Sequence, residues 1–504
     1  MGEPFYITTA ISYPNGRPHI GHAYEAIAAD AIARFQRSRG RDVRLVGGTD
    51  EHGLKMVQTA RSEGRDTLEF ADEMSGYFRA MADRFDILYD AFVRTTESRH
   101  ERASIAIWEA MKAAGDLYLD RYEGWYSVRD EAFYDESELV EGEGGGERVS
   151  PQGTPVEWTA EETWFFRLSK YQQPLLDLYA ANPQFIQPDS RRNEVVRFVE
   201  GGLKDLSVSR TSFDWGVPVP GSPRHVMYVW VDALTTYMTG VGYPDDREEF
   251  DRYWPADVHL IGKDIVRFHA VYWPAFLMSA GLPLPKQIYG HGFLLSRGEK
   301  MSKSVGNVVD PMVLAERFGV DALRYFLLRE VPFGQDGSYS PEAIVNRANA
   351  ELANSFGNLA QRTLSMIHKN LDGVIPARGK AEADKELLTT VLGATQAEVP
   401  DAFDRFAFSV GIEAWLRAVF ACNAYIDAQA PWTLRKTDPQ RMAAVLGTLV
   451  DAVRELARAI APVIPGSADK LLTLIDAGEG GAPIPQPVPL FPRLELPEQE
   501  EEAA

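Results

Sequence analysis

The sequence contains very little cysteine and lacks long apolar segments. Only one of its 504 residues is a cysteine, Cys422, so neither a disulfide framework nor a zinc site made of several cysteines can form. No run of 18 apolar residues occurs, and the N-terminal residues carry Glu3 without the sustained apolar stretch of a signal peptide. We therefore expect a protein of the reducing cytoplasm without a membrane span.

Positive charge is scarce as well. Lysine and arginine number 52 against 73 aspartates and glutamates, and the formal net charge is −21. Generic adhesion to nucleic acid depends on cations that neutralise phosphates, so this composition excludes it. An RNA partner would have to meet a local basic surface, and the segment from Lys286 to Lys303 is a candidate.

Hydrophobic patterning predicts an α/β core in the N-terminal part of the chain. Residues 5–10 form an apolar, β-branched run before a turn-rich segment, and residues 19–39 repeat small and apolar residues at helical spacing. Further apolar runs at residues 43–46 and 258–261 predict more strands. This order is typical of a Rossmann-like parallel sheet, whose ligands bind at the carboxyl ends of the strands.

The remaining patterns divide the chain into further segments. Short aromatic stretches and a Gly/Glu-rich patch follow Leu117 and predict an insertion that splits the core. Beyond Pro341 apolar residues recur at spacings of three and four, as in a helical bundle, and the clearest stripe is Leu446, Leu449, Val453, Leu456 and Ile460. The expected segments are 1–117 and 225–290 for the two halves of the core, 118–224 for the insertion, 291–340 for a segment with a lysine-rich loop, 341–485 for the helical domain and 486–504 for an acidic tail.

A histidine motif, His19-Ile20-Gly21-His22, opens the first predicted helix. A helix N-terminus favours an anion through its free N–H groups and its dipole, and Gly21 lets the backbone approach a nucleotide. Two imidazoles one turn apart could donate hydrogen bonds to the phosphates of ATP. A metal-binding pair and ordinary histidines at a helix start are the alternatives, and the motif alone does not separate them.

A lysine motif, Lys300-Met301-Ser302-Lys303-Ser304, lies in a polar segment flanked by glycines. It suits a mobile loop that presents two ammonium groups to a triphosphate, although a solvated basic loop is the simpler interpretation when the motif is taken alone. Together, in this order and on either side of the insertion, the two motifs resemble the paired signatures of class I aminoacyl-tRNA synthetases.

Five segments extend the resemblance over nearly the whole chain to the methionyl-tRNA synthetases. They are residues 10–16 (AISYPNG), 48–53 (GTDEHG), 228–233 (YVWVDA), 262–269 (GKDIVRFH) and 300–304 (KMSKS). The resemblance implies a methionine–tRNA ligase that activates L-methionine with ATP and Mg²⁺ and transfers it to tRNA(Met). It also implies that the split core is catalytic, that residues 118–224 are the connective insertion domain, that residues 291–340 contact the tRNA stem and that the helical domain binds the anticodon.

The resemblance assigns roles to individual residues. The catalytic set would be His19, His22, Lys300 and Lys303, and the ATP-binding set would combine the two lysines with Gly21, Glu25, Gly262, Lys263 and Asp264. Asp50 would hold the substrate ammonium through a charge-assisted hydrogen bond. The rest of the methionine pocket would be Ala10, Ile11, Tyr13, Trp230, Ala233, Leu234, Tyr237, Ile265, His269 and Trp273, whose aromatic members suit a polarisable thioether.

Some of these residues have simpler interpretations. Trp230, Tyr237 and Trp273 could be aromatic core residues. His269 could be a buried histidine with its hydrogen bonds satisfied, and Glu25 could be a helix residue that faces solvent.

The anticodon assignment also rests on the resemblance. Asn354, Asn358 and Arg362 follow one another at i, i+4 and i+8 of a predicted helix, and Trp432 follows Pro431 at the start of another segment. The family reads its CAU anticodon from comparable positions, and unpaired bases are commonly read by aromatic stacking and edge hydrogen bonds. Trp432 could instead be a packing residue.

The sequence departs from many relatives in two respects. It has no cysteine where their insertion domain carries zinc knuckles, so we expect no metal apart from Mg²⁺. It also lacks the C-terminal dimerising module of some relatives, so we expect a monomer. A class I synthetase for another small apolar amino acid, a small nucleotidyltransferase and a non-catalytic tRNA-binding relative remain the alternatives. Another class I synthetase is disfavoured, because the aliphatic enzymes have a larger editing insertion and the cysteine enzyme has cysteine-ligated zinc. The intact motifs argue against a non-catalytic relative.

Overall fold

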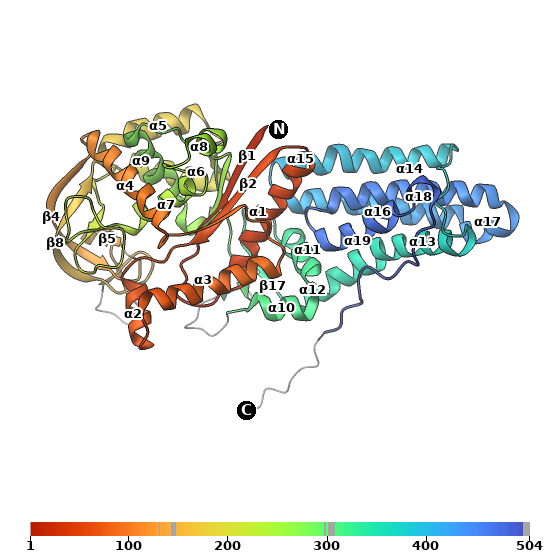
Figure 1. The fold of residues 1–504 in the computed structure, drawn as a ribbon, viewed down its shortest axis with the longest axis horizontal. Coiled ribbons are helices and arrows are strands. Elements are labelled where there is room, and N and C mark those ends of the chain that lie inside the picture. Colours follow the sequence, from red (N-terminus) through yellow and green to blue (C-terminus); the bar gives the residue numbers. More distant parts are fainter. Residues whose placement is uncertain (1, 131, 143–147, 297–298, 301–307, 497–504) are drawn as a thin grey trace. The chain divides into compact units, whose positions relative to one another are not determined.

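The computed structural model describes residues 2–130, 132–142, 148–296, 299–300 and 308–496 (Figure 1). It divides into two compact units: Met1–Pro18 with Arg39–His291, and His19–Ser38 with Gly292–Ala504. In the part of the chain that the structure describes, no helix is long and apolar enough to cross a membrane.

A parallel sheet forms the centre of the first unit. Its order is β3-β2-β1-β13-β14-β9, and the strands are β1 (Pro4–Thr9), β2 (Asp42–Thr49), β3 (Ala91–Arg94), β9 (Ile186–Gln187), β13 (Val258–Gly262) and β14 (Ile288–His291). Ile7 pairs with Leu45 on one side and with Val258 on the other, and all three are buried. Parallel strands are usually covered on both faces, which explains the continuous apolar runs in the sequence. The predicted strands at 5–10, 43–46 and 258–261 are thus confirmed.

Helices of the same unit complete its core. These are α2 (Leu54–Ser62), α3 (Thr67–Arg84), α4 (Ser98–Ala113), α7 (Val229–Thr239), α8 (Arg247–Tyr253) and α9 (Trp273–Ala280). The α4 helix packs against α7 and α9 around the fully buried Trp108 and Trp273. A π-helical turn, η4 (Phe268–Tyr272), runs directly into α9.

The inserted segment is built on two long antiparallel strands, β4 (Leu117–Ser127) and β8 (Glu157–Phe166), at the orange and yellow edge of Figure 1. β5 (Ala132–Tyr134) and β10 (Leu206–Ser207) complete its sheet in the order β10-β8-β4-β5, and α5 (Gln172–Ala181) and α6 (Asp189–Glu200) follow. Between these two helices, β9 pairs with β14 of the central sheet. The inserted segment therefore also contributes a strand to the core.

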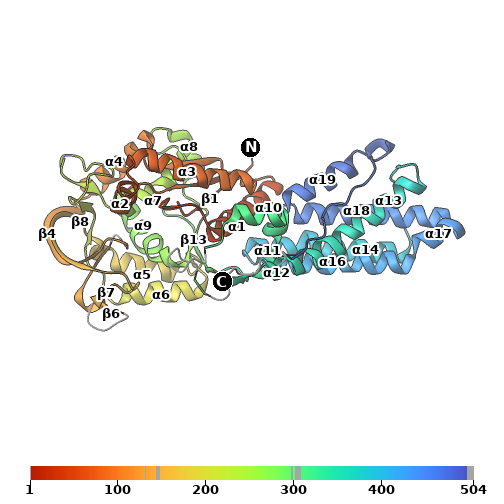
Figure 2. The same ribbon diagram turned by 90° about the horizontal axis from the view of Figure 1, so that it is seen from below.

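The second unit begins with α1 (Ile20–Ser38) and is otherwise formed by the C-terminal part. It contains β15 (Leu294–Ser296), β16 (Glu299–Lys300), β17 (Gly337–Tyr339), α10 (Pro311–Phe318), α11 (Val320–Glu330), α12 (Pro341–Arg347), η5 (Ala348–Gly357), α13 (Asn358–Asn370), α14 (Glu382–Gly393), α15 (Val399–Asp404), α16 (Phe408–Gln429), α17 (Pro431–Thr437), α18 (Pro439–Ile460) and α19 (Pro465–Asp476). Figure 2 shows α13, α14, α16 and α18 alongside one another. The five residues of the predicted apolar stripe lie on α18 and are all buried, which confirms the bundle.

A buried ion pair fastens α1 within this unit. The Arg324 guanidinium on α11 donates to the Asp30 carboxylate on α1 at 2.6 Å, and it also donates to the carbonyls of Pro462 and Val463 at 3.0 Å each. Neither charged side chain is exposed. Because a buried charge needs partners on several sides, this arrangement fixes the helix that carries the histidine motif against the turn that follows α18.

Candidate active site

Both histidines of the motif cap the start of α1 with their rings. The His19 backbone N–H donates to Nδ1 of His22, and the Gly21 N–H donates to Nδ1 of His19, each at 3.0 Å. An imidazole nitrogen that accepts a backbone N–H carries no proton, so in each neutral ring the proton is on Nε2. The ring centroids are 3.8 Å apart. The start of α1 therefore presents two neighbouring Nε2–H donors, which suit an anionic ligand.

Gly21 is required by this cap, because a Cβ at this position would lie 2.9 Å from Cε1 and Nδ1 of His19. Any larger residue would push the ring away from the backbone N–H that it accepts. Glu25, half-buried, follows one turn later on the same helix. Lys300 ends β16, but its side chain and the whole of Lys303 lie outside the described residues.

Three residues predicted to bind ATP, Gly262, Lys263 and Asp264, lie at the carboxyl end of the central strand β13 and directly after it. Gly262 ends the strand, and Lys263 and Asp264 form the short turn η3. A cavity of about 710 Å³ opens beside this turn, and Lys263 and Asp264 line it together with Tyr228 and Phe268. The position of this cavity agrees with the rule that ligands of parallel sheets bind beyond the carboxyl ends of the strands.

Two predicted pocket residues, Tyr237 on α7 and His269 on η4, are joined by a hydrogen bond. Nδ1–H of His269 donates to the Ile265 carbonyl at 2.9 Å, so Nε2 accepts from the Tyr237 hydroxyl at 2.7 Å. Burial lowers the pKa of His269 to about 4, and the ring is therefore neutral at pH 7. Trp230 stacks on Phe268 at 3.9 Å between ring centroids and meets the His269 ring edge-on at 5.9 Å. An aromatic wall results, as a thioether site requires.

The other predicted pocket residues surround this wall in different ways. Trp273 is fully buried, donates its indole N–H to His259 at 3.2 Å and packs behind Tyr237. Leu234 belongs to the same core cluster, Ala10 and Ile265 pack against that cluster, and Ala233 is buried on α7. Ile11 is half-buried in the loop after β1. Tyr13 packs instead against a smaller cluster on α2 and α3, and its hydroxyl accepts the Met56 N–H at 3.1 Å.

Asp50 directly follows β2, in the loop beyond the carboxyl end of that strand. Its backbone N–H donates to the Ser12 carbonyl at 2.8 Å, and the Ser12 N–H donates to the Gly48 carbonyl at 3.0 Å. These bonds align the loops after β1 and β2, which hold Ala10, Ile11 and Asp50. The Asp50 side chain is 9% exposed, so a ligand ammonium in contact with it would be largely withdrawn from water.

A histidine–aspartate–histidine cluster behind this loop was not predicted from the sequence. The fully buried Asp232 on α7 accepts from Nδ1 of His52 and from Nε2 of His100, both at 2.6 Å. Burial alone would lower the pKa of His52, but the charge of Asp232 and the hydrogen bond to it outweigh burial and raise the pKa. Asp232 adjoins the pocket residue Ala233, so the cluster links α7 to the loop that contains Asp50.

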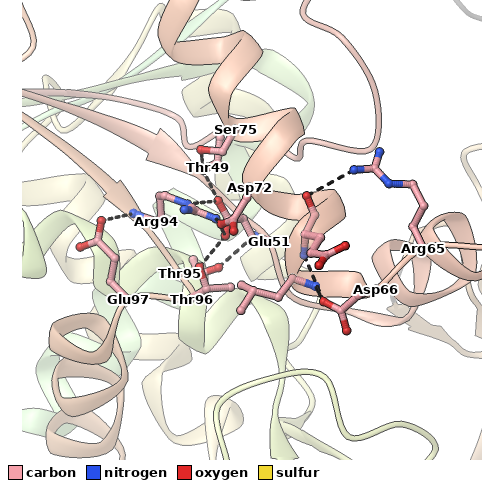
Figure 3. Close-up of polar contacts among 12 residues, drawn as sticks. Thr49, Glu51, Arg65, Asp66, Asp72, Ser75, Arg94, Thr95, Thr96 and Glu97 are labelled. Carbon is pink, nitrogen blue, oxygen red and sulfur yellow. Dashed lines mark hydrogen bonds and ion pairs between the residues drawn. The ribbon is translucent and has the colours of Figure 1, made fainter.

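A second buried carboxylate, Glu51, also escaped prediction (Figure 3). It accepts from Nε and a terminal nitrogen of Arg94 at 2.7 and 2.9 Å, from the Thr49 hydroxyl at 2.7 Å and from the Thr96 hydroxyl at 2.6 Å. Arg94 continues to Asp72 on α3 at 2.5 Å. Glu51 lay within the GTDEHG motif, but the sequence offered no signal for its partners.

The predicted anticodon residues lie on the helical domain of the second unit. Asn354 and Asn358 are exposed, and the Arg362 guanidinium lies 5.1 Å from the ring centroid of the 43% exposed Trp432. Arg362 also donates to Asp427 at 3.0 Å. Asn354 lies in the π-helical η5, and Asn358 and Arg362 lie on α13, which follows it directly, so the predicted helix is π-helical where Asn354 lies.

Comparison with known proteins agrees with this arrangement. The family model described as "tRNA synthetases class I (M)" matches residues 5–364, and that described as "Anticodon binding domain of methionyl tRNA ligase" matches residues 375–486. The methionine–tRNA ligase of Brucella suis biovar 1 is 58% identical over 506 residues, with 97% of this chain and 98% of that protein covered. That of Mycobacterium tuberculosis strain H37Rv is 55% identical over 521 residues, with 99% of each chain covered.

A solved structure gives the same result. M. tuberculosis methionyl-tRNA synthetase in complex with methionyl-adenylate superposes with a TM-score of 0.93 at 56% identity, over 97% of this chain and 100% of that one. The chain therefore belongs to the methionyl-tRNA synthetase family of class I aminoacyl-tRNA synthetases.

Proposed function

We propose that this chain is a methionine–tRNA ligase that activates L-methionine with ATP to methionyl adenylate and then transfers the methionyl group to tRNA(Met). Identity of 55–58% over the full length of ligases with this activity is the observation that carries the proposal. The neutral Tyr237–His269 pair, the stacked Trp230 and the capped histidines supply chemistry suited to it. A non-catalytic relative would have no need for two oriented imidazole donors.

In the first step the methionine carboxylate attacks the α-phosphate of ATP and pyrophosphate leaves. Such phosphoryl chemistry depends mainly on positioning and on charge stabilisation, which Mg²⁺ supplies in part when bound. Nε2–H of His19 and His22 would donate to the phosphates, and Lys300 and Lys303 would neutralise the phosphate charge. The remaining residues of the ATP-binding set would hold the nucleoside, and these are Glu25, Gly262, Lys263 and Asp264. In the second step a terminal hydroxyl of the tRNA takes the acyl group from the adenylate.

Recognition of methionine combines one charge with an apolar wall. Asp50 would hold the ammonium, and Trp230, Tyr237 and His269 would contact the thioether. Because His269 is neutral and the Tyr237 hydroxyl donates a hydrogen bond to it, neither ring brings a charge to the thioether end. An apolar pocket discriminates one methylene by only about 1–3 kcal/mol, so homocysteine is the most serious competitor.

ATP–pyrophosphate exchange with each of the twenty amino acids tests the proposal. Exchange should depend on methionine and on Mg²⁺, with leucine, isoleucine, valine and cysteine near background. Exchange driven best by one of those four would replace the methionine assignment, and no exchange with any amino acid would favour a non-catalytic tRNA-binding protein.

We also propose that the segment bounds expected from the sequence mark the functional domains. In the helical domain, the residues proposed to read the anticodon are Asn354, Asn358, Arg362 and Trp432. The cation–π contact between Arg362 and the half-exposed Trp432 supports this role, since one face of the indole is held by the guanidinium while part of the ring is open to solvent. Aromatic and arginine side chains are common platforms for unpaired bases.

Trp432→Ala should lower kcat/KM for tRNA(Met) by roughly 10–100-fold, because stacking on one base is worth about 1–3 kcal/mol. Methionine-dependent pyrophosphate exchange should not change. Leu392→Ala, which truncates an exposed apolar residue of α14, is the control and should leave charging intact. Equal charging by the two variants would count against the anticodon role of Trp432.

We further propose that the enzyme works without zinc. In the inserted segment, Asp130 accepts hydroxyl hydrogen bonds from Tyr134, Ser150 and Thr154 at 2.5–3.0 Å, and Ser127 bonds Thr154 at 2.6 Å. This cluster holds two turns together with oxygen groups, whereas structural zinc prefers thiolate and imidazole ligands. Among the described residues no group of three or more His, Cys, Asp or Glu could hold a metal.

Prolonged treatment with a zinc-selective chelator, followed by Mg²⁺, should leave charging activity and melting temperature unchanged. Loss of activity that added Zn²⁺ restores would overturn this part of the proposal.

We also propose a cytoplasmic monomer. Light scattering after size exclusion should give the mass of one 56.2 kDa chain.

A further inference from the structure

The loop after β2 places the proposed ammonium-binding residue, Asp50, beside a second carboxylate, Glu51. Neighbouring charges of the same sign repel one another, so each carboxylate needs cationic or hydrogen-bonding partners of its own. Glu51 is fully buried, so its charge is stabilised only by the groups that surround it. The outcome at Asp50 therefore depends on what neutralises Glu51.

Four hydrogen bonds reach the Glu51 carboxylate in Figure 3. Two come from Arg94 at the end of β3, and the others come from the hydroxyls of Thr49 and Thr96. A bidentate Arg–carboxylate pair is short and fixed in direction. It offsets the Glu51 charge on the side of β3 and fixes the Glu51 side chain to the end of that strand.

The backbone of Glu51 is held as firmly as its side chain. Its N–H donates to the Thr95 hydroxyl at 2.9 Å, and its carbonyl accepts the Trp215 indole N–H at 2.6 Å. On the next residue, His52 is fixed by Asp232. The peptide that follows Asp50 is thus anchored to three separate parts of the first unit, so the backbone at Asp50 is held in place before a ligand arrives.

We propose that Glu51 is a positioning residue for methionine recognition: paired with Arg94, it fixes the loop so that Asp50 meets the substrate ammonium. This inference rests on the proposed function, in which Asp50 binds that ammonium. Loss of the Glu51 charge would have two effects. The side chain would lose its ionic anchor to β3, and the Arg94 guanidinium would keep Asp72 instead of holding the loop.

The test compares two ligands that differ only in the ammonium: L-methionine and 4-(methylthio)butanoate. Binding of each to the full chain is measured by calorimetry. Glu51→Gln keeps the size of the side chain and should weaken methionine binding on the order of tenfold, since small misplacements at a charged contact are costly. Binding of the desamino ligand should not change, because that ligand makes no use of Asp50.

Two further variants keep the result interpretable. Asp72→Asn changes the second, 54% exposed carboxylate that the same terminal nitrogen of Arg94 reaches, and should leave both affinities unchanged because the pair of Glu51 with Arg94 stays in place. Thr96→Val, at a half-buried position, removes one hydroxyl donor from Glu51. It should weaken methionine binding as Glu51→Gln does, but less. This variant keeps the inference testable if Glu51→Gln does not fold.

Equal weakening of both ligands in Glu51→Gln or in Thr96→Val would show general damage to the pocket and would overturn the inference, as would no weakening of either. Asp50→Asn separates the two levels of the argument. If Asp50→Asn weakens methionine alone and Glu51→Gln does not, only the positioning role fails. If Asp50→Asn leaves methionine binding intact, the ammonium site of the proposed function fails as well.

Discussion

His22→Ala is expected to slow methionine-dependent ATP–pyrophosphate exchange by about 10²–10³-fold, the usual cost of losing one preorganised donor to a transition state. The reason lies in the capped start of α1. Because Nδ1 of His22 accepts the His19 N–H, its Nε2–H is oriented before ATP binds. The substitution removes that donor, and it also leaves the His19 N–H without the ring that caps it.

Methionine binding and melting temperature separate chemistry from folding in this variant. The methionine dissociation constant should stay unchanged, and stability should fall by no more than the roughly 1 kcal/mol of a helix cap. His22→Asn, whose side chain also has a donor and an acceptor, is the matched variant and should recover part of the rate. Wild-type exchange in His22→Ala would show that the motif is an ordinary helix start, which is the alternative that the sequence left open.

The predictions that rested on periodicity are confirmed by the structure. The predicted apolar runs at 5–10, 43–46 and 258–261 correspond to β1, β2 and β13, because strands buried on both faces need continuous apolar sequence. The stripe from Leu446 to Ile460 became the buried face of α18. The family predicted from the paired motifs is confirmed by matches over the full length.

The contacts that orient the site could not be predicted in the same way, because each joins residues far apart in sequence. Glu51 and Arg94 are separated by 43 positions, His52 and Asp232 by 180, and Arg324 and Asp30 by 294. In each pair the sequence shows the ionisable residues but not which partner each of them meets. Partner choice is decided by tertiary packing, on which local spacing carries no information.

The same limit applies within the motifs. In YVWVDA, the aromatic residue Trp230 was predicted to face methionine, whereas Asp232 received no role, although it is the buried partner of two histidines. A helix turns by about 100° per residue, so neighbours in a motif face different directions and serve different purposes. In GTDEHG, Asp50 is proposed to meet the ligand, whereas Glu51 and His52 hold the loop through Arg94 and Asp232.

Asp50→Asn is expected to weaken methionine binding by about 10²–10³-fold, because removal of one partner from a desolvated ion pair costs about 3–5 kcal/mol. The change keeps the shape of the side chain, and the backbone bonds of Asp50 to Ser12 are unaffected. In steady-state exchange the effect should appear as a raised KM for methionine with an unaltered KM for ATP.

L-Methioninol, which keeps the ammonium and lacks the carboxylate, gives an independent measurement of the same contact. Its inhibition of the wild-type enzyme should be lost in Asp50→Asn, whereas inhibition by 4-(methylthio)butanoate should be retained. An asparagine variant that binds both ammonium-containing ligands as tightly as the wild type would show that another group holds the ammonium. The half-buried loop after β1 would then be the first place to search, since the backbone bond from Asp50 to Ser12 holds this loop against Asp50.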